Sequence, residues 1–337
     1  MVDAPFPWFG GKRDIAPQVW EALGNVAHYV EPFFGSGAVL LQRPHASKFE
    51  TVNDADGLLA NFWRAVSADP ETVADHADWP CNEADLHARH IWLVGNRERL
   101  TERLMGDADF YDAKAAGWWV WGSCNWIGSG WCSGQGPWVS IEGELTDVRK
   151  LPHLSSAQGV NRQLPHLSEG RGVNRKLPHL SEGRGVNRKL FITKWFASIA
   201  DRMRDVRVAC GDWSRVTGPA VLDAGGGLTG IFLDPPYSSE EHSIKYADGQ
   251  PDVARDVLAW CAENGDRPNL RIVLAGYAGE HDSLNEIGWS AVHWKARGGY
   301  GSQGDGRGRE NSARERLWLS PHCMGVAPDL FSIGAAA

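Results

Sequence analysis

The chain has 337 residues, of which 42% are hydrophobic and 23% are charged, a balance that excludes a largely disordered protein. No apolar run approaches the ~18 residues that a membrane span needs, and residues 1–12 lack the features of a signal peptide. We therefore expect a cytoplasmic protein without a membrane partner. The formal net charge of −8 argues against a nucleic-acid partner.

The charge is distributed unevenly along the chain. Residues 149–207 contain 13 Lys and Arg residues against 4 acidic residues, so the rest of the chain is strongly acidic. A basic segment of this kind is typical either of a face that contacts a polyanion or of a solvated loop. The charge alone does not separate these two interpretations.

Predicted helices and strands alternate at both ends of the chain. In the N-terminal part, the sequence predicts helices at 14–23, 38–42 and 58–66 and strands at 30–34 and 49–53. In the C-terminal part, it predicts strands at 206–210, 231–233, 272–275, 290–295 and 316–319 and a helix at 252–263. This alternation predicts an α/β fold with a doubly wound, mostly parallel sheet of seven strands.

The middle of the chain interrupts this alternation. Residues 72–105 are polar and helical in character, whereas 117–138 are rich in Trp and Gly and look too glycine-broken for a long helix. Residues 151–189 are three tandem copies of a 13-residue repeat, each with a Pro and a Gly. We interpret the repeats as an expanded surface loop, with a dedicated recognition element as the alternative. The predicted organisation is 1–68 and 199–337 as one domain, with 69–198 inserted.

Cysteine and histidine spacing gives no sign of a metal site. The six cysteines include no C-x-x-C pair, so neither a zinc ribbon nor a disulfide framework is indicated. His87 and His90 are close in sequence but lack further ligands at metal spacing. We therefore expect no bound metal.

Polar and glycine residues follow two predicted strands in the N-terminal part. Gly35 and Gly37 lie where the first strand turns into a helix, and glycines there allow close approach of a ligand to the helix N-terminus. An incidental turn is the alternative. Asp54 ends the next strand, where a carboxylate either binds the ribose of a nucleoside cofactor or caps the helix that begins near Gly57.

The sharpest motif is the run Asp234-Pro235-Pro236-Tyr237, which follows an apolar strand. Two prolines fix the backbone, so that the Asp234 carboxylate, the Pro235 carbonyl and the Tyr237 ring form a rigid group. Such a group suits a planar base, because two acceptors meet an exocyclic amine and the ring stacks on the base. A proline turn with incidental Asp and Tyr is the alternative.

Four motifs in this order resemble the Dam-type DNA adenine N6-methyltransferases, which use S-adenosylmethionine. They are Trp8-Phe9-Gly10-Gly11-Lys12, Glu31-Pro32-Phe33-Phe34-Gly35-Ser36-Gly37, Asn53-Asp54 and Asp234-Pro235-Pro236-Tyr237. The resemblance covers about residues 5–66 and 200–320. It implies a Rossmann-like sheet of seven strands with an antiparallel last strand, an inserted target-recognition domain, and double-stranded DNA as the partner. The repeats resemble expanded loops of phage-encoded relatives, which implies a bacterial or phage-infected host cytoplasm.

The resemblance also implies roles for single residues. Trp8 and Lys12 would help to hold the cofactor, Phe33, Gly35 and Gly37 would line its methionine end, and Asp54 would bind its ribose. Asp212, after the third strand, would bind the cofactor adenine. Asp234, beside the cofactor, would hold the flipped target adenine together with Pro235, Pro236 and Tyr237. Methyl transfer would be direct, without a catalytic cysteine.

Three other functions compete with DNA adenine methylation. The same proline turn suits cytosine N4 or an RNA adenine, although Asp at the head of the motif favours adenine in DNA. A catalytically silent DNA-binding protein of the same fold is a second alternative. A nicotinamide oxidoreductase, indicated by the Gly turn alone, leaves the proline motif unexplained. No nuclease signature is visible, so a restriction endonuclease, if there is one, would be a separate protein.

Overall fold

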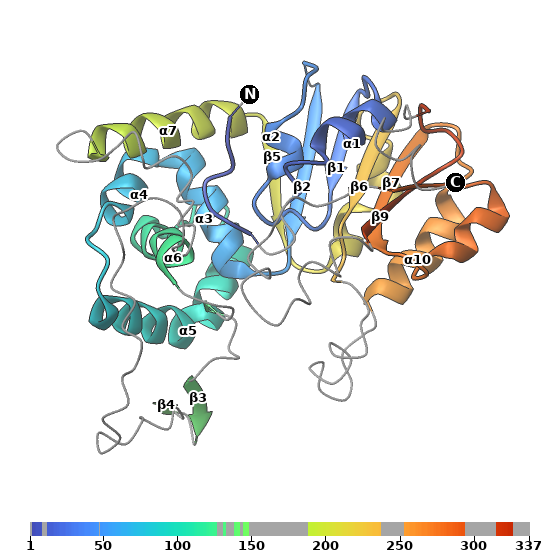
Figure 1. The fold of residues 1–337 in the computed structure, drawn as a ribbon. Coiled ribbons are helices and arrows are strands. Elements are labelled where there is room, and N and C mark those ends of the chain that lie inside the picture. Colours follow the sequence, from blue (N-terminus) through green and yellow to red (C-terminus); the bar gives the residue numbers. More distant parts are fainter. Residues whose placement is uncertain are drawn as a thin grey trace, which may run out of the picture. The chain divides into compact units, whose positions relative to one another are not determined.

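The computed structural model describes residues 2–8, 12–46, 48–126, 131–132, 138–141, 144–147, 188–236, 253–293 and 315–325 (Figure 1). These residues fall into two compact units: one comprises 1–4, 8–56 and 202–337, and the other 5–7 and 57–201. The repeats lie outside the described residues, apart from Arg188 and Lys189. The domain boundaries predicted at 68/69 and 198/199 stay predictions.

The first unit is built on a sheet of seven strands in the order β5-β2-β1-β6-β7-β9-β8 (Figure 1). The strands are β1 (His28–Glu31), β2 (Phe49–Asp54), β5 (Val206–Cys210), β6 (Thr229–Leu233), β7 (Leu270–Tyr277), β8 (Ser290–His293) and β9 (Glu315–Leu319). The strands from β5 to β7 in this order pair in parallel, and β9 pairs antiparallel with both β7 and β8. The expected seven-stranded, mostly parallel sheet with an antiparallel last strand is confirmed.

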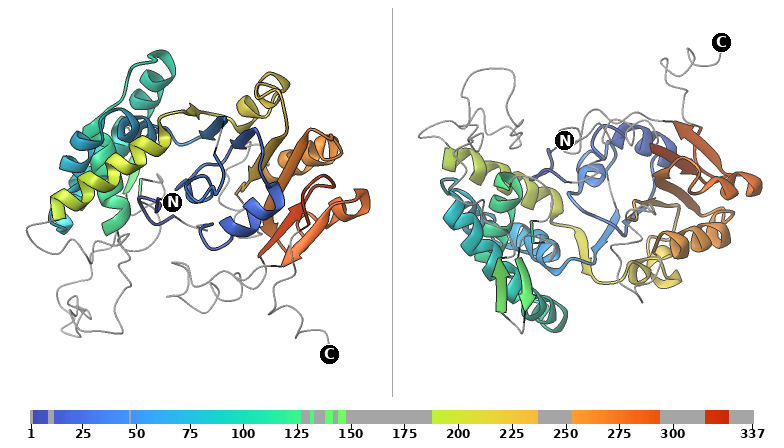
Figure 2. Two further views of the ribbon diagram at one scale, coloured as in Figure 1. Left: turned by 90° about the horizontal axis from the view of Figure 1, so that it is seen from above. Right: turned by 60° about the horizontal axis from the view of Figure 1, so that its bottom comes forward.

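Helices cover both faces of this sheet. The helical segments of the unit are α1 (Ala16–Leu23), α2 (Ala38–Leu41), η1 (Trp213–Val216), α8 (Pro219–Leu222), α10 (Val253–Asn264) and η2 (Asp282–Ile287). Gly230 of β6 faces Leu23 of α1, whereas Ile231 packs with Val257 of α10 in one buried cluster. Because successive strand residues point to opposite faces, α1 and α10 lie on opposite sides of the sheet, as the two views in Figure 2 also show.

Strand β1 is shorter than the sequence predicts. The expected strand at 30–34 ends at Glu31, and the chain then turns into α2. Pro32 has no N–H for a sheet hydrogen bond, and Gly35 and Gly37 have positive φ angles of 49° and 66°. Glycine adopts this region without the penalty of a side chain, so the glycine motif forms a tight turn at the end of β1.

A buried ion network joins the two sequence segments of the first unit. Glu50, in β2, is 5% exposed and pairs with Arg43 at 3.0 Å and with Arg202 at 2.6 Å. Arg43 also donates to the Val26 carbonyl at 2.7 Å, and Arg202 donates to the Leu40 carbonyl at 3.1 Å. Since Arg202 follows the segment 57–201, this network fixes the returning chain against β2.

The second unit is mainly helical. It contains α3 (Gly57–Ala68), α4 (Pro70–Ala77), α5 (Glu83–Gly106), α6 (Ala113–Asn125), most of α7 (Arg188–Met203), and an antiparallel pair, β3 (Trp138–Ile141) and β4 (Glu144–Asp147). Phe6 packs edge-on against Phe62 and Trp119, with ring centroids 5.4 and 4.8 Å apart. This aromatic cluster forms part of the core of the unit.

The Trp- and Gly-rich stretch is more helical than the sequence predicts. Helix α6 continues through Gly117 and Gly122 to Asn125. A Cβ atom at Gly117 would lie 2.7 Å from the Val73 carbonyl oxygen of α4, and one at Gly122 would overlap the Trp131 ring. The glycines therefore serve close packing of the helix, which outweighs their low helix propensity. The expectation of a glycine-broken segment is wrong for this part.

His90 is a core residue of the second unit. Its ring stacks on Trp126 at a centroid distance of 5.1 Å, and its Nδ1 accepts a hydrogen bond from the Cys132 N–H at 3.4 Å. Burial lowers the pKa of His90. Across the described ranges, no three His, Cys, Asp or Glu side chains gather as a metal site would require, and no helix there has both the length and the apolar composition of a membrane span.

Candidate active site

The predicted site residues of the first unit gather at one edge of the sheet. Strands β1, β2, β5 and β6 run in parallel, so their carboxyl ends meet at the same edge. The glycine turn follows β1, Asp54 ends β2, Asp212 follows β5 and Asp234 follows β6. From β1 the chain continues to β2 on one side and later to β6 on the other. Ligands of open α/β sheets bind at such a switch point.

Asp54 holds the glycine turn in place. Its Oδ2 accepts the Gly35 N–H at 3.0 Å and its Oδ1 accepts the Asp56 N–H at 3.0 Å. Both donors lie outside α3, so these bonds do not support the alternative in which Asp54 caps that helix. Burial raises the pKa of Asp54 to about 6. A half-buried carboxylate with a raised pKa at the edge of a sheet is typical of a functional site.

We expect the Asp54 carboxylate to make the stability of the protein depend on pH. Its pKa is about 6 in the folded protein, against 3.8 for an unperturbed Asp, so folding favours the protonated form. This contribution is present below about pH 4 and is lost as the pH rises through 6, which amounts to about 3 kcal/mol at ~1.4 kcal/mol per pKa unit. Urea unfolding of the wild type and Asp54→Asn between pH 4 and 8 measures it. A difference between them that is independent of pH would contradict the prediction.

Asn53 connects two turns at this edge and was not among the predicted site residues. Its Nδ2 donates to the Pro32 carbonyl at 3.1 Å and to the Gly211 carbonyl at 2.9 Å. Its buried Oδ1 has no hydrogen-bond partner among the described residues. The Gly211 N–H in turn donates to the Asp54 carbonyl at 3.0 Å. The turns after β1 and β5 are thus fixed to the end of β2, with one buried acceptor left for a further donor.

The Trp8 indole lies directly against the glycine turn. A Cβ atom at Gly35 would be only 2.6 Å from Nε1 of Trp8 and 2.9 Å from its Cδ1. Since Gly35 also has a positive φ of 49°, the position accepts no side chain. Two residues that the sequence predicts to hold the same cofactor are thereby in contact.

The sequence resemblance implies S-adenosylmethionine as the cofactor. Gly35→Ala is expected to weaken its binding by at least about tenfold, because the methyl group displaces Trp8 and strains the turn. Isothermal titration calorimetry measures this loss. Gly226→Ala is the matched control: Gly226 has a similar φ of 59°, but nothing lies within 4 Å of its Cβ position. Equal affinities of the two variants would show that the contact with Trp8 has no part in binding.

Aromatic rings and Asp212 lie beyond the glycine turn. Phe33 stacks on Trp213 with centroids 6.2 Å apart and an interplanar angle of 27°. Asp212 begins η1, where its Oδ1 accepts the Ser214 N–H at 2.9 Å and also the Ser214 hydroxyl. The Asp212 side chain is exposed, so the start of η1 orients a carboxylate that solvent still reaches.

Lys12 and Asp234 meet, although 222 residues separate them in the sequence. The Lys12 Nζ lies 3.0 Å from Asp234 Oδ1, and the Lys12 side chain is only 6% exposed. Pro235 is buried and Pro236 is exposed; Tyr237 lies outside the described residues. The sequence resemblance assigns Lys12 to the cofactor and Asp234 to the target base, and the structure joins the two in one ion pair.

Two further carboxylates belong to this edge and were not predicted. Glu31, the last residue of β1, is 3% exposed and accepts a hydrogen bond from the Tyr29 hydroxyl at 2.9 Å. Burial raises the pKa of Glu31 well above its usual range, and the charge of Asp234 acts in the same direction. Glu315, the first residue of β9, is 8% exposed. Glu31 was visible in the glycine motif, but Glu315 has no local sequence signal.

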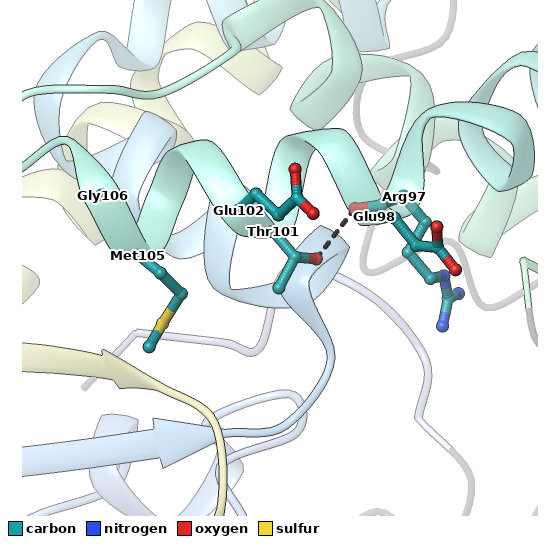
Figure 3. Close-up of a pocket in the computed structure, with 6 residues that line it drawn as sticks. All are labelled: Arg97, Glu98, Thr101, Glu102, Met105 and Gly106. Carbon is teal, nitrogen blue, oxygen red and sulfur yellow. Dashed lines mark hydrogen bonds between the residues drawn. The ribbon is translucent and has the colours of Figure 1, made fainter.

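An open hollow lies elsewhere, along α5 of the second unit (Figure 3). Thr101 Oγ1 donates there to the Arg97 carbonyl at 2.8 Å. The lining residues are Arg97, Glu98, Thr101, Glu102, Met105 and Gly106. None of the predicted site residues is among them.

The family comparison agrees with the sequence motifs. Residues 8–93 match the model of the D12 class N6 adenine-specific DNA methyltransferase family. The match covers 86 of the 337 residues. The resemblance to Dam-type enzymes is confirmed, and so is the expectation of an enzyme of this type. A comparison with curated proteins gave no match.

The match to the D12-class family begins at Trp8 and includes Lys12, the glycine turn and Asp54. It ends within α5, so Asp234 and the proline motif lie beyond it. The ion pair between Lys12 and Asp234 joins the matched segment to the proline motif. The D12-class family implies methylation of adenine N6 in DNA.

Proposed function

We propose that this protein transfers a methyl group from S-adenosylmethionine to N6 of adenine in double-stranded DNA, at a specific site, by flipping the base and transferring the methyl group directly. The observation that carries the proposal is the 3.0 Å pair between Lys12 and Asp234. It joins the D12-class segment to the Asp-Pro-Pro-Tyr motif at the carboxyl edge of one sheet. Neither segment alone supports the whole proposal.

The residues at this edge fit S-adenosylmethionine. Asp54 presents a half-buried carboxylate, and Asn53 presents a buried amide oxygen that has no partner in the described part of the chain. Both groups can accept hydrogen bonds from ribose or amino donors. Gly35 lets the Trp8 indole lie directly against the backbone of the turn. Phe33 and Trp213 provide aromatic surface. In this proposal Trp8, Lys12, Gly37, Asp212 and Asp234 complete the cofactor site.

The proline motif would activate the amino group of the target adenine. The N6 lone pair is delocalised into the ring, so it becomes nucleophilic only when N6 moves toward a tetrahedral geometry. Asp234 and the Pro235 carbonyl would accept its two hydrogens and hold that geometry. When bound, S-adenosylmethionine supplies an activated methyl group, whose bond to sulfur breaks with the electron pair left on sulfur. N6 forms the new bond and then loses one proton to solvent.

In this proposal, base flipping brings the target adenine out of the duplex, so that its N6 can reach Asp234 and the Pro235 carbonyl. Extruding a base from a duplex costs a few kcal/mol, which stacking on Tyr237 would partly offset. Pro235 and Pro236 fix the backbone on which Asp234 and Tyr237 stand. Asp234 is thereby prepositioned for an in-line reaction, which reduces the entropic part of the barrier.

The direct test is a nucleoside analysis of methylated DNA. The protein is incubated with S-adenosylmethionine and unmethylated duplex DNA of mixed sequence, and the DNA is digested and examined for N6-methyladenine. N6-Methyladenine formed by the wild type, and absent with Asp234→Ala, supports the proposal. N4-Methylcytosine would overturn the choice of base. If neither product forms, the protein is not a DNA methyltransferase.

We further propose that residues 69–198 contribute target recognition, as the insertion of the Dam-type enzymes does. In this proposal the repeats are an expanded loop, so removing one copy is expected to leave the rate and the methylated sequence nearly unchanged. Neutralising Arg171, Arg175, Arg184 and Arg188 is expected to reduce the salt dependence of DNA binding if these residues touch phosphates. Fluorescence anisotropy across a salt series measures this slope. A changed target sequence would refute the loop interpretation.

A further inference from the structure

Glu315 is a buried carboxylate that the proposed function does not yet use. It begins β9 and lies opposite Tyr277, the last residue of β7, in the antiparallel register. Its side chain is 8% exposed, and its Oε2 has no hydrogen-bond partner among the described residues. A buried acceptor in this state is costly to folding, so its presence needs an explanation.

The charges that act on Glu315 are those of the candidate active site. Burial raises the pKa of Glu315, the positive charge of Lys12 opposes this effect, and the negative charge of Asp234 adds to it. Across the strand pair stands Tyr277, and the adjacent Arg316 donates to the Glu315 main-chain carbonyl at 2.8 Å. The Glu315 side chain thus lies within electrostatic range of the Lys12–Asp234 pair.

The Lys12 ammonium therefore acts on two carboxylates, that of Asp234 after β6 and that of Glu315 at the start of β9. Its ammonium pairs with Asp234 at 3.0 Å and is almost completely removed from water. An ammonium has three hydrogens and a compact charge, so it serves more than one acceptor. The Lys12 ammonium and the Asp234 carboxylate together are neutral. The Glu315 carboxylate gives the three groups a net negative charge.

We propose that Glu315 is a positioning residue for methyl transfer, whose negative charge attracts the Lys12 ammonium in competition with Asp234. The inference rests on the proposed function. Without Glu315 the ammonium belongs to Asp234 alone, and the Asp234 carboxylate becomes a weaker acceptor for the N6 hydrogens. Because N6 gains positive charge as its new bond forms, an excess of negative charge at this edge also stabilises the transition state.

The test compares Glu315→Gln, which removes the charge but keeps the size, with Glu263→Gln, which removes the same charge from the exposed side of α10. Glu315→Gln is expected to lower kcat about 10- to 100-fold, with KM values within about twofold and an unchanged melting temperature. Glu263→Gln keeps the wild-type kcat. Glu315→Asp, which retains the charge, is expected to recover part of the loss.

Two further readouts separate positioning from a structural role. Since Glu315 acts as the carboxylate, the wild-type kcat falls as the pH drops through its raised pKa. This limb is absent in Glu315→Gln, whereas any limb from Asp54 or Glu31, whose pKa values are also raised, is retained in both proteins. In a Lys12→Met background, Glu315→Gln is expected to cause little further loss, because the shared ammonium is already missing.

Three results would overturn the inference. A wild-type kcat in Glu315→Gln would do so, as would an unchanged pH profile or fully additive losses with Lys12→Met. In each of these cases N6-methyladenine from the wild type would leave the proposed function standing. Absence of any methylated base from the wild type would instead overturn the proposed function, and this inference with it.

Discussion

Asp234→Asn is expected to lower the rate of methyl transfer about 100- to 1,000-fold, with a much smaller loss of affinity for S-adenosylmethionine, because Asp234 is only one of several residues proposed for the cofactor site. The variant keeps the size of the side chain but replaces one charged acceptor by a neutral amide, and loss of one preorganised polar group costs about this much in other active sites. The amide also turns a donor toward the N6 hydrogens. Single-turnover transfer of a labelled methyl group measures the rate, and calorimetry measures the affinity.

Any substitution of Asp234 also breaks its ion pair with Lys12, so a loss of activity could reflect a loss of stability. A matched double variant separates the two effects. Lys12 is buried, so removing its partner leaves a charge without compensation, which destabilises proteins by about 3–5 kcal/mol. Combining Asp234→Asn with Lys12→Met removes that penalty. If the double variant regains stability but not activity, the loss is chemical. Activity near the wild-type level in either variant would exclude Asp234 from the reaction.

Glu50→Gln is expected to lower the free energy of unfolding by about 3–5 kcal/mol, because it leaves the buried Arg43 without its counter-charge. Glu50 is also the residue through which Arg202 holds the returning chain, so one substitution loosens both arginines. Urea unfolding followed by far-UV circular dichroism measures the change.

Asp3→Asn is the control for Glu50→Gln. Asp3 pairs with Arg13 at 2.6 Å, but more than half of the Arg13 side chain is exposed. Exposed pairs contribute less than about 1 kcal/mol, so this variant is expected to unfold close to the wild type. Comparable losses of unfolding free energy in the two variants would mean that burial of the Glu50 network does not increase its contribution to stability.

The strands of the first unit could be predicted because their sequences carry the signal locally. The apolar, β-branched run at 206–210 is β5 to the residue, and 49–53 differs from β2 only by Asp54. Buried parallel strands are continuous apolar runs. The family resemblance implied seven strands and an antiparallel last strand, but not their order in the sheet. After Glu31, proline and glycine determine the backbone conformation. The strand therefore ends earlier than the hydrophobic pattern indicates.

Site residues were predictable when they stand in a motif and not when only tertiary neighbours define them. Asp54, Lys12 and Asp234 belong to recognisable motifs. Asn53 stands in the Asn53-Asp54 motif, but its role does not follow from it, because its bond to Gly211, 158 residues away, leaves no local pattern. Glu315 opens a strand in which no nearby residue marks it as part of a site. For Gly117 the local sequence was misleading. The low helix propensity of glycine indicated a broken helix, but packing against α4 favours a continuous one.

The pairing of β1 with β6 has a consequence for biosynthesis. His28 pairs with Thr229, and Glu50 pairs with Val206, so the central sheet requires residues made early and residues made late. Helices α3 to α6 come from one continuous stretch of the sequence, so they can pack against one another while the ribosome is still translating the rest of the chain. A chain stopped before residue 229 would expose one edge of β1 and leave Lys12 without Asp234. Premature termination would therefore yield an aggregation-prone fragment rather than a partly active enzyme.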